Sequence, residues 1–66
     1  MTPKPKNAKE LKRLRISNFI SQGNIAEEMR TNRSYISHVE TGLRPLTDEF
    51  RERYITAVET LKTKMK

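Results

Sequence analysis

The chain has 66 residues and no cysteine, so a domain of this length has to be held together by apolar packing alone. A domain so small buries only about 60% of the surface that its unfolded chain exposes, and neither a disulfide framework nor a thiolate zinc site can add to its stability. Hydrophobic residues make up 33% of the chain and charged residues another 33%. Such a lean composition supports a folded domain only if the apolar positions are well patterned.

The apolar residues recur at helical spacing, and no stretch alternates apolar and polar residues as a strand would. We therefore predict an all-α fold of four helices, with a fifth helix left open. The four are expected at about 8–18, 22–29, 33–40 and from 48 onward. Each follows a residue that can cap its first turn, namely Asn7, Ser21, Asn32 and Thr47. Gly42 is expected to end the third helix, because glycine adopts positive φ at little steric cost. The predicted buried faces comprise Leu11, Leu14, Ile25, Ala26, Met29, Ile36, Val39, Leu46, Phe50, Tyr54, Ala57, Val58, Leu61 and Met65.

The charges indicate a polyanionic partner. Fourteen Lys and Arg stand against eight Asp and Glu, which gives a net charge of +6 and an isoelectric point near 10.1. Nucleic acid is the leading candidate and a membrane surface is the second. Residues 1–7 combine two prolines with two lysines and offer nothing to bury. We predict a flexible basic N-terminal arm at 1–7, a folded domain at 8–62 and a frayed basic C-terminus at 63–66.

Several classes of protein are disfavoured by what the sequence lacks. No apolar run is long enough to span a bilayer, and no apolar stretch follows the N-terminal lysines as it would in a signal peptide. We therefore expect a cytoplasmic protein. His38 is the only histidine and Asp48 the only aspartate, so neither a metal site nor a catalytic triad is expected. The sequence predicts no enzymatic activity and no cofactor.

The helices expected at 22–29 and 33–40 are short and are separated by three residues. The small side chain of Ala26 permits their close approach, so residues 21–41 are expected to form a helix-turn-helix unit. The segment from Ser21 to Gly42 resembles the Cro/C1-type helix-turn-helix family of phage repressors and bacterial transcriptional regulators. The residues that carry the likeness, without a gap, are Ser21, Gln22, Ile25, Ala26, Met29, Asn32, Arg33, Ser34, Tyr35, Ile36, Ser37, Val39, Glu40 and Gly42. It extends upstream over 11–15 and downstream over 44–50.

The resemblance implies a regulator of transcription, and we expect a repressor that binds a near-palindromic double-stranded DNA operator as a homodimer. Such a protein is expected in bacteria, encoded by a chromosome, a phage or a plasmid. Five positions match the groove-facing residues of the family's third helix and are predicted to read bases. They are Asn32, Arg33, Ser34, Ser37 and His38. Arg33 is the strongest of these, because a guanidinium can donate two hydrogen bonds to O6 and N7 of guanine. Gln22 matches the family's phosphate-contacting glutamine. Arg15 and Glu40 match a pair that joins the first helix to the end of the third, which implies a structural ion pair.

The further candidates for phosphate contact are Tyr35, Arg44, Arg30, Lys4 and Lys6. Tyr35 can contact a phosphate through its hydroxyl or pack its ring against the scaffold, and Arg44 can contact the backbone or remain a solvated loop charge. Lys4 and Lys6 can lie along the backbone, enter a minor groove or attract DNA non-specifically. Arg30 replaces the family's usual turn glycine. Either its turn has shifted to right-handed geometry, which we expect, or a left-handed residue is tolerated at about 1–2 kcal/mol because the side chain gains a phosphate contact.

The main alternative is a protein-binding module, such as an antitoxin or an inhibitor of another regulator, because one fold serves many functions. The small and polar residues predicted on the outer face of 33–40 favour DNA, since a protein-binding surface is expected to expose apolar anchors. RNA binding is disfavoured because the chain has only four aromatic residues, and membrane binding because the apolar stripes are narrow. Phe19 departs from the small residue that is common at its position in the family. The candidates for dimer contacts are Leu43 and the helix expected from 48 onward, through Ile55, Val58 and Met65; the alternative for some of these residues is a place wholly in the core.

Overall fold

The computed structural model describes residues 6–64 and shows four helices and no strand among them. The helices are α1 (Ala8–Ser17), α2 (Gln22–Glu28), α3 (Arg33–Glu40) and α4 (Asp48–Lys64). The predicted all-α class is confirmed, and residues 6–64 contain no fifth helix. Lys4 and Met65, to which the sequence assigns roles, lie outside the described residues. Helix α4 reaches Lys64, inside the segment predicted to fray, and there Lys64 Nζ pairs with Glu28 Oε1 of α2 at 3.0 Å.

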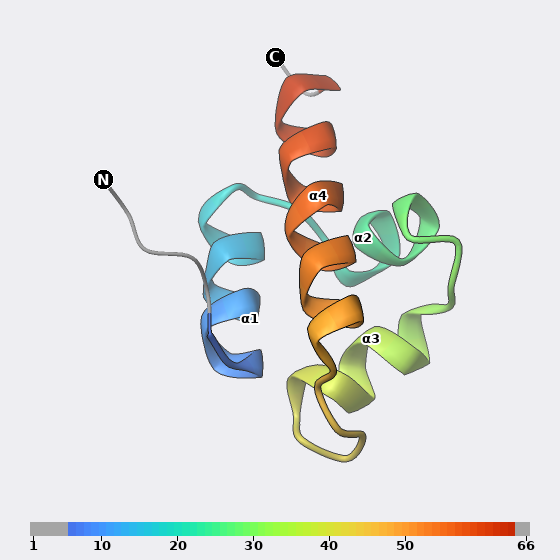
Figure 1. The fold of residues 1–66 in the computed structure, drawn as a ribbon. Coiled ribbons are helices and arrows are strands. Elements are labelled where there is room, and N and C mark those ends of the chain that lie inside the picture. Colours follow the sequence, from blue (N-terminus) through green and yellow to red (C-terminus); the bar gives the residue numbers. More distant parts are fainter. Residues whose placement is uncertain (1–5, 65–66) are drawn as a thin grey trace.

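The longest helix, α4, spans the molecule (Figure 1). Helices α1 and α2 lie on either side of it, and α3 crosses near its N-terminal end. Both α1 and α2 pack against α3 as well as against α4. One side of α3 is therefore covered by the other helices, and its other side is open to solvent.

All four predicted N-caps are confirmed. In each case a side-chain oxygen accepts a hydrogen bond from the backbone N–H three residues on, which satisfies a donor that the first helical turn leaves unpaired. The four distances, 2.9, 3.0, 2.8 and 3.1 Å in chain order, belong to Asn7, Ser21, Asn32 and Thr47. Helix starts are thus fixed by short polar side chains that lie next to them in sequence.

Helices α1, α2 and α3 all end in the same way, with two backbone hydrogen bonds around a residue of positive φ, the arrangement known as the Schellman motif. The positive-φ residues are Phe19 (φ 58°), Arg30 (φ 58°) and Gly42 (φ 88°). After α2, the Arg30 N–H donates to Glu27 O at 3.1 Å and the Thr31 N–H donates to Ala26 O at 2.8 Å. The expected right-handed turn at Arg30 is therefore wrong. A left-handed residue is retained because it directs both N–H groups onto carbonyls that the end of α2 would otherwise leave unpaired.

The core lies where the four helices meet and consists of Leu11, Ile20, Ile25, Ala26, Met29, Ile36, Val39, Phe50, Tyr54, Ala57 and Val58. Leu14, Leu46 and Leu61 are partly buried against it. The predicted faces are therefore confirmed within the described residues, and Ile20 adds a member that helical spacing did not indicate. Of the two places considered for Val58, the core and a dimer interface, the structure shows the core, since the residue is 0% exposed.

Candidate nucleic-acid interface

The open side of α3 and its N-cap bring together the five residues predicted to read bases. Ile36 and Val39 turn inward and are buried. The residues on the other side are exposed or half-buried, and they are Asn32, Arg33, Ser34, Ser37 and His38. Their side chains are polar and short except for Arg33 and His38, so this face can donate and accept hydrogen bonds at several adjacent points.

A buried ion pair holds the C-terminal end of α3 against α1. Arg15 Nε lies 2.9 Å from Glu40 Oε2, and Arg15 Nη2 donates to Glu40 Oε1 at 3.0 Å, which makes the contact bidentate. The remaining nitrogen, Arg15 Nη1, donates to Ile20 O at 2.8 Å. All three nitrogens of the guanidinium are thereby bonded, and the position of α3 relative to α1 is fixed.

Two further donors reach the same carboxylate. The Tyr54 hydroxyl donates to Glu40 Oε2 at 2.6 Å, and Gln22 Nε2 donates to Glu40 Oε1 at 3.2 Å. Sequence reasoning placed Tyr54 on the apolar face of its helix and missed this contact. The available signal was chemical, since a tyrosine in a core usually finds a partner for its hydroxyl.

The hydrogen bonds keep the ion pair charged despite burial. Burial by itself would raise the pKa of Glu40, but hydrogen bonds from Arg15, Tyr54 and Gln22 outweigh it, and the pKa is lowered. Burial would likewise lower the pKa of Arg15, and its bonds to Glu40 raise it. Burial and the carboxylate beside it both raise the pKa of Tyr54, so this hydroxyl stays protonated as a donor.

Gln22, predicted to contact a phosphate, connects the ion pair with the open face of α3. A carboxylate can only accept, so the amide nitrogen of Gln22 must face Glu40 and its oxygen must point the other way. That oxygen accepts a long hydrogen bond, 3.5 Å, from Arg33 Nε. The orientation of the Gln22 amide is therefore set by the buried pair, and the amide in turn contacts the Arg33 side chain.

Tyr35 and Arg44 form a second arrangement beside α3. The Tyr35 ring is half-buried, with its centroid 5.5 Å from that of Phe50, and Phe50 lies 5.9 Å from Tyr54. The Arg44 guanidinium sits 5.1 Å above the Tyr35 ring, a cation–π distance. Of the two roles considered for Tyr35, the structure shows ring packing. Arg44 is exposed in the α3–α4 connection and is held over the ring.

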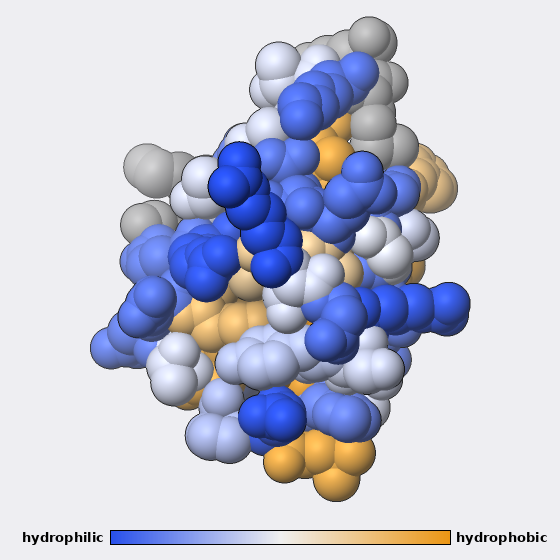
Figure 2. All heavy atoms as spheres, turned by 90° about the vertical axis from the view of Figure 1, so that its right-hand side faces the viewer, coloured by the Kyte–Doolittle hydropathy of each residue, from blue (hydrophilic) through white to orange (hydrophobic). Residues whose placement is uncertain are grey.

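The remaining predicted phosphate contacts within residues 6–64 are Arg30, which shares a groove with Tyr35, and Lys6. Arg30 lines two grooves, shared with Arg53, that separate the α2–α3 corner from α4. It therefore lies beside α4 rather than on the open face of α3. Lys6 is exposed just before α1. Figure 2 shows the side of the molecule that carries the α2–α3 corner, covered mostly by hydrophilic side chains.

Neither a metal site nor a membrane-spanning helix is found in residues 6–64. No three His, Asp or Glu side chains there gather closely enough to hold a metal ion. None of the four helices is both long and apolar enough to cross a membrane. Compared with known protein families, curated proteins and solved structures, the chain shows no match to any of them.

Proposed function

We propose that this protein is a sequence-specific regulator of transcription that binds double-stranded DNA, and that it acts as a repressor of the Cro/C1 helix-turn-helix type. The supporting observation is the open face of α3, where five polar side chains lie side by side on a helix anchored from behind by the bidentate Arg15–Glu40 pair. An α-helix fits the major groove of B-DNA, where each base pair presents its own pattern of donors and acceptors.

In this proposal Arg33 reads guanine. Its Nε is engaged by Gln22 Oε1, and the two terminal nitrogens remain to donate in parallel to O6 and N7. Asn32 uses its side-chain oxygen to cap α3, so its amide nitrogen is the group that can reach a base acceptor. Ser34, Ser37 and His38 add single donors and acceptors along the same face.

Contacts to the DNA backbone supply affinity in this proposal. Arg44 is held over the Tyr35 ring next to α3, so a phosphate meets a guanidinium that is already positioned. Gln22 reaches α3 from α2, where it contacts Glu40 and Arg33. These groups and the net charge of +6 are expected to release counterions from DNA, which makes binding strongly dependent on salt.

We propose further that two copies bind a near-palindromic operator. A single module of this size buries only about 600–1,000 Å² against DNA, and two recognition helices about 34–36 Å apart would enter successive major grooves. Of the expected contacts, Leu43 is 75% exposed and Ile55 is partly buried, so both remain available for pairing. Sedimentation with a full palindrome should show two chains per duplex. One chain per duplex, without a cooperative second binding step, would contradict the dimer.

Selection of bound duplexes from random DNA, followed by titration of the selected site at rising salt, tests the proposal. The expected result is a defined site with two related half-sites, bound at least tenfold more tightly than a scrambled duplex at about physiological salt. Affinity should fall steeply between low and physiological salt. Recovery of no common site, or equal affinity for every duplex, would reject sequence-specific binding.

A further inference from the structure

Phe19, between α1 and α2, combines two unfavourable features. Its φ is 58°, in the left-handed region where a residue with a Cβ is strained, and glycine occupies the equivalent position after α3. Its side chain is also 87% exposed, so the strained backbone does not serve to bury the ring. The positive φ closes the end of α1, but a glycine would serve there equally well, so it is the exposed aromatic ring at this position that points to a role in binding.

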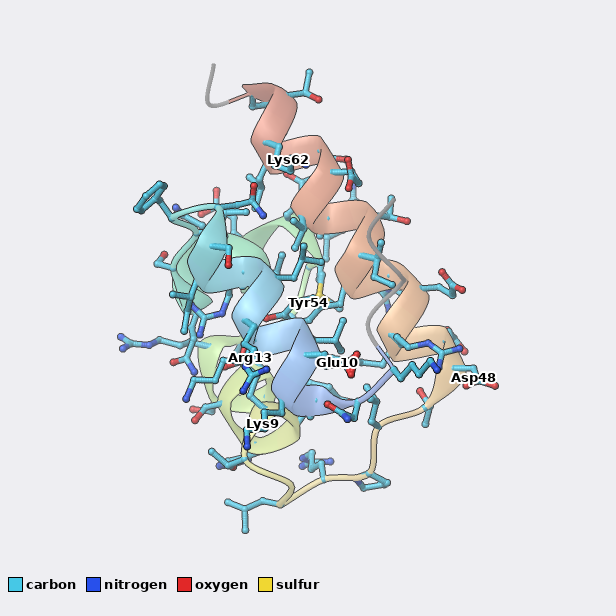
Figure 3. All side chains as sticks on the ribbon, turned by 90° about the vertical axis from the view of Figure 1, so that its left-hand side faces the viewer. Lys9, Glu10, Arg13, Asp48, Tyr54 and Lys62 are labelled. Carbon is cyan, nitrogen blue, oxygen red and sulfur yellow. The ribbon has the colours of Figure 1, made fainter. Side chains whose placement is uncertain are left out.

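The outward face of α1 lies next to Phe19 in the chain. Leu11 and Arg15 turn inward, and the opposite face carries Lys9, Lys12, Arg13 and Ile16 at spacings of three and four residues. All four are exposed, Ile16 to 52%. Figure 3 shows Lys9 and Arg13 along one flank of α1, with Glu10 on the flank nearer α4.

The three cations on this face are Lys9, Lys12 and Arg13. Within residues 6–64, none of Lys9, Lys12 or Arg13 forms an ion pair with a carboxylate. The apolar residues Ile16 and Phe19 lie beyond them, at the C-terminal end of the helix and in the connection to α2. The face is therefore basic along two turns and apolar at one end.

We propose that this α1 docking face, made of Lys9, Lys12, Arg13, Ile16 and Phe19, binds an acidic segment of another protein. In this arrangement carboxylates of the segment pair with the three cations, and an apolar side chain of the segment packs on Phe19 and Ile16. The charges steer and orient the partner, while the aromatic ring supplies the central apolar contact. The inference is independent of DNA binding, because it uses none of the residues on the open face of α3.

Three other occupants fit the face less well. A two-fold pairing of this chain would set cations against cations, since the face carries no acidic residue. DNA phosphates would pair with the lysines but gain nothing from an exposed Phe and Ile. A membrane-surface helix presents an apolar stripe along its whole length, whereas here the apolar part is confined to one end.

The test is a selection of displayed random linear peptides on the full-length protein, with affinities of the selected peptides measured by fluorescence anisotropy. Peptides that carry several acidic residues and at least one Leu or aromatic residue should be enriched. Phe19→Gly and Arg13→Glu should each weaken their binding about tenfold or more. Lys62→Glu, a charge reversal on α4, is the matched control and should leave binding within about twofold.

Phe19→Gly also separates docking from a structural role. Because glycine relieves the left-handed strain, the variant should have a higher melting temperature while losing the peptides. Its affinity for a selected DNA site should be unchanged, so a failure of the DNA proposal would not be mistaken for a failure of this one. The inference is overturned if no acidic, apolar peptides are enriched, if Phe19→Gly binds them as well as the natural chain does, or if Phe19 is instead required for binding vesicles of phosphatidylserine and phosphatidylcholine.

Discussion

Replacing Arg30 with glycine should stabilise the protein. Arg30 has φ 58° because the two hydrogen bonds that close the end of α2 require a left-handed residue there. For a residue with a Cβ this conformation costs about 1–2 kcal/mol. Glycine removes that cost but makes the unfolded chain more flexible, which takes back about 0.4–1 kcal/mol. The two ranges leave a net gain of about 0–1.6 kcal/mol, and its central value of about 0.8 kcal/mol corresponds in a domain of this size to a rise of about 3–6 °C in melting temperature.

Arg30→Ala is the control, because it removes the same side chain and keeps the left-handed strain. Thermal and urea unfolding of both variants should show Arg30→Gly above the natural chain and Arg30→Ala at or below it, with unchanged urea m-values. Phe19→Gly should add to Arg30→Gly nearly in full, since each acts on its own turn. Equal stabilisation by Ala and Gly, or a loss of stability with Gly, would refute the argument from backbone strain.

Three further predictions concern the network behind α3. Glu40→Gln should cost about 3–5 kcal/mol, because it leaves the buried Arg15 charge without a partner. The pKa of Glu40 is lowered on folding, so the stability that its carboxylate contributes is fully present above its ordinary pKa of about 4.3 and is lost as pH falls through the lowered pKa. Urea unfolding across this pH range should therefore show a fall in the free energy of unfolding that Glu40→Gln lacks. If the free energies of unfolding of the two proteins changed in parallel with pH, the pKa of Glu40 would not be lowered. Tyr54→Phe should cost about 1.5–3 kcal/mol in thermal unfolding, since it removes a donor at 2.6 Å from a carboxylate, and no loss would mean that this bond adds nothing. Gln22→Ala should weaken binding to all duplexes and also broaden the preference at the base read by Arg33; unaltered titrations would remove Gln22 from the interface.

Local features of the fold were predictable from the sequence. Asn7, Ser21, Asn32 and Thr47 each act within three residues along the chain, so their capping is visible in a short window. The helical spacing of apolar residues likewise indicated most of the core. The Arg15–Glu40 contact joins residues that are 25 positions apart, and only the resemblance to a family suggested it.

What could not be predicted depends on partners that the spacing of apolar residues does not reveal. The hydrogen bond from Tyr54 to Glu40 becomes necessary only once both side chains are buried at the same place. The left-handed conformation of Arg30 is imposed by two carbonyls of α2 against the preference of its own side chain. The sequence left Val58 between the core and an interface, because an apolar helix position looks the same whether it faces the core or a second copy. In each case the group that decides the outcome is not visible in the helical spacing of apolar residues.

Whether α3 reads DNA sequence is decided by the base preferences of Arg33→Ala. The natural chain, Arg33→Ala and the control Lys62→Ala would each be titrated against the selected duplex and against every single-base variant of it. We expect Arg33→Ala to lose about 1–3 kcal/mol on the selected site and to lose discrimination at one guanine in each half-site, while Lys62→Ala keeps the full ranking. An unchanged ranking with Arg33→Ala, or an equal loss on every duplex, would contradict the placement of Arg33 at a base edge.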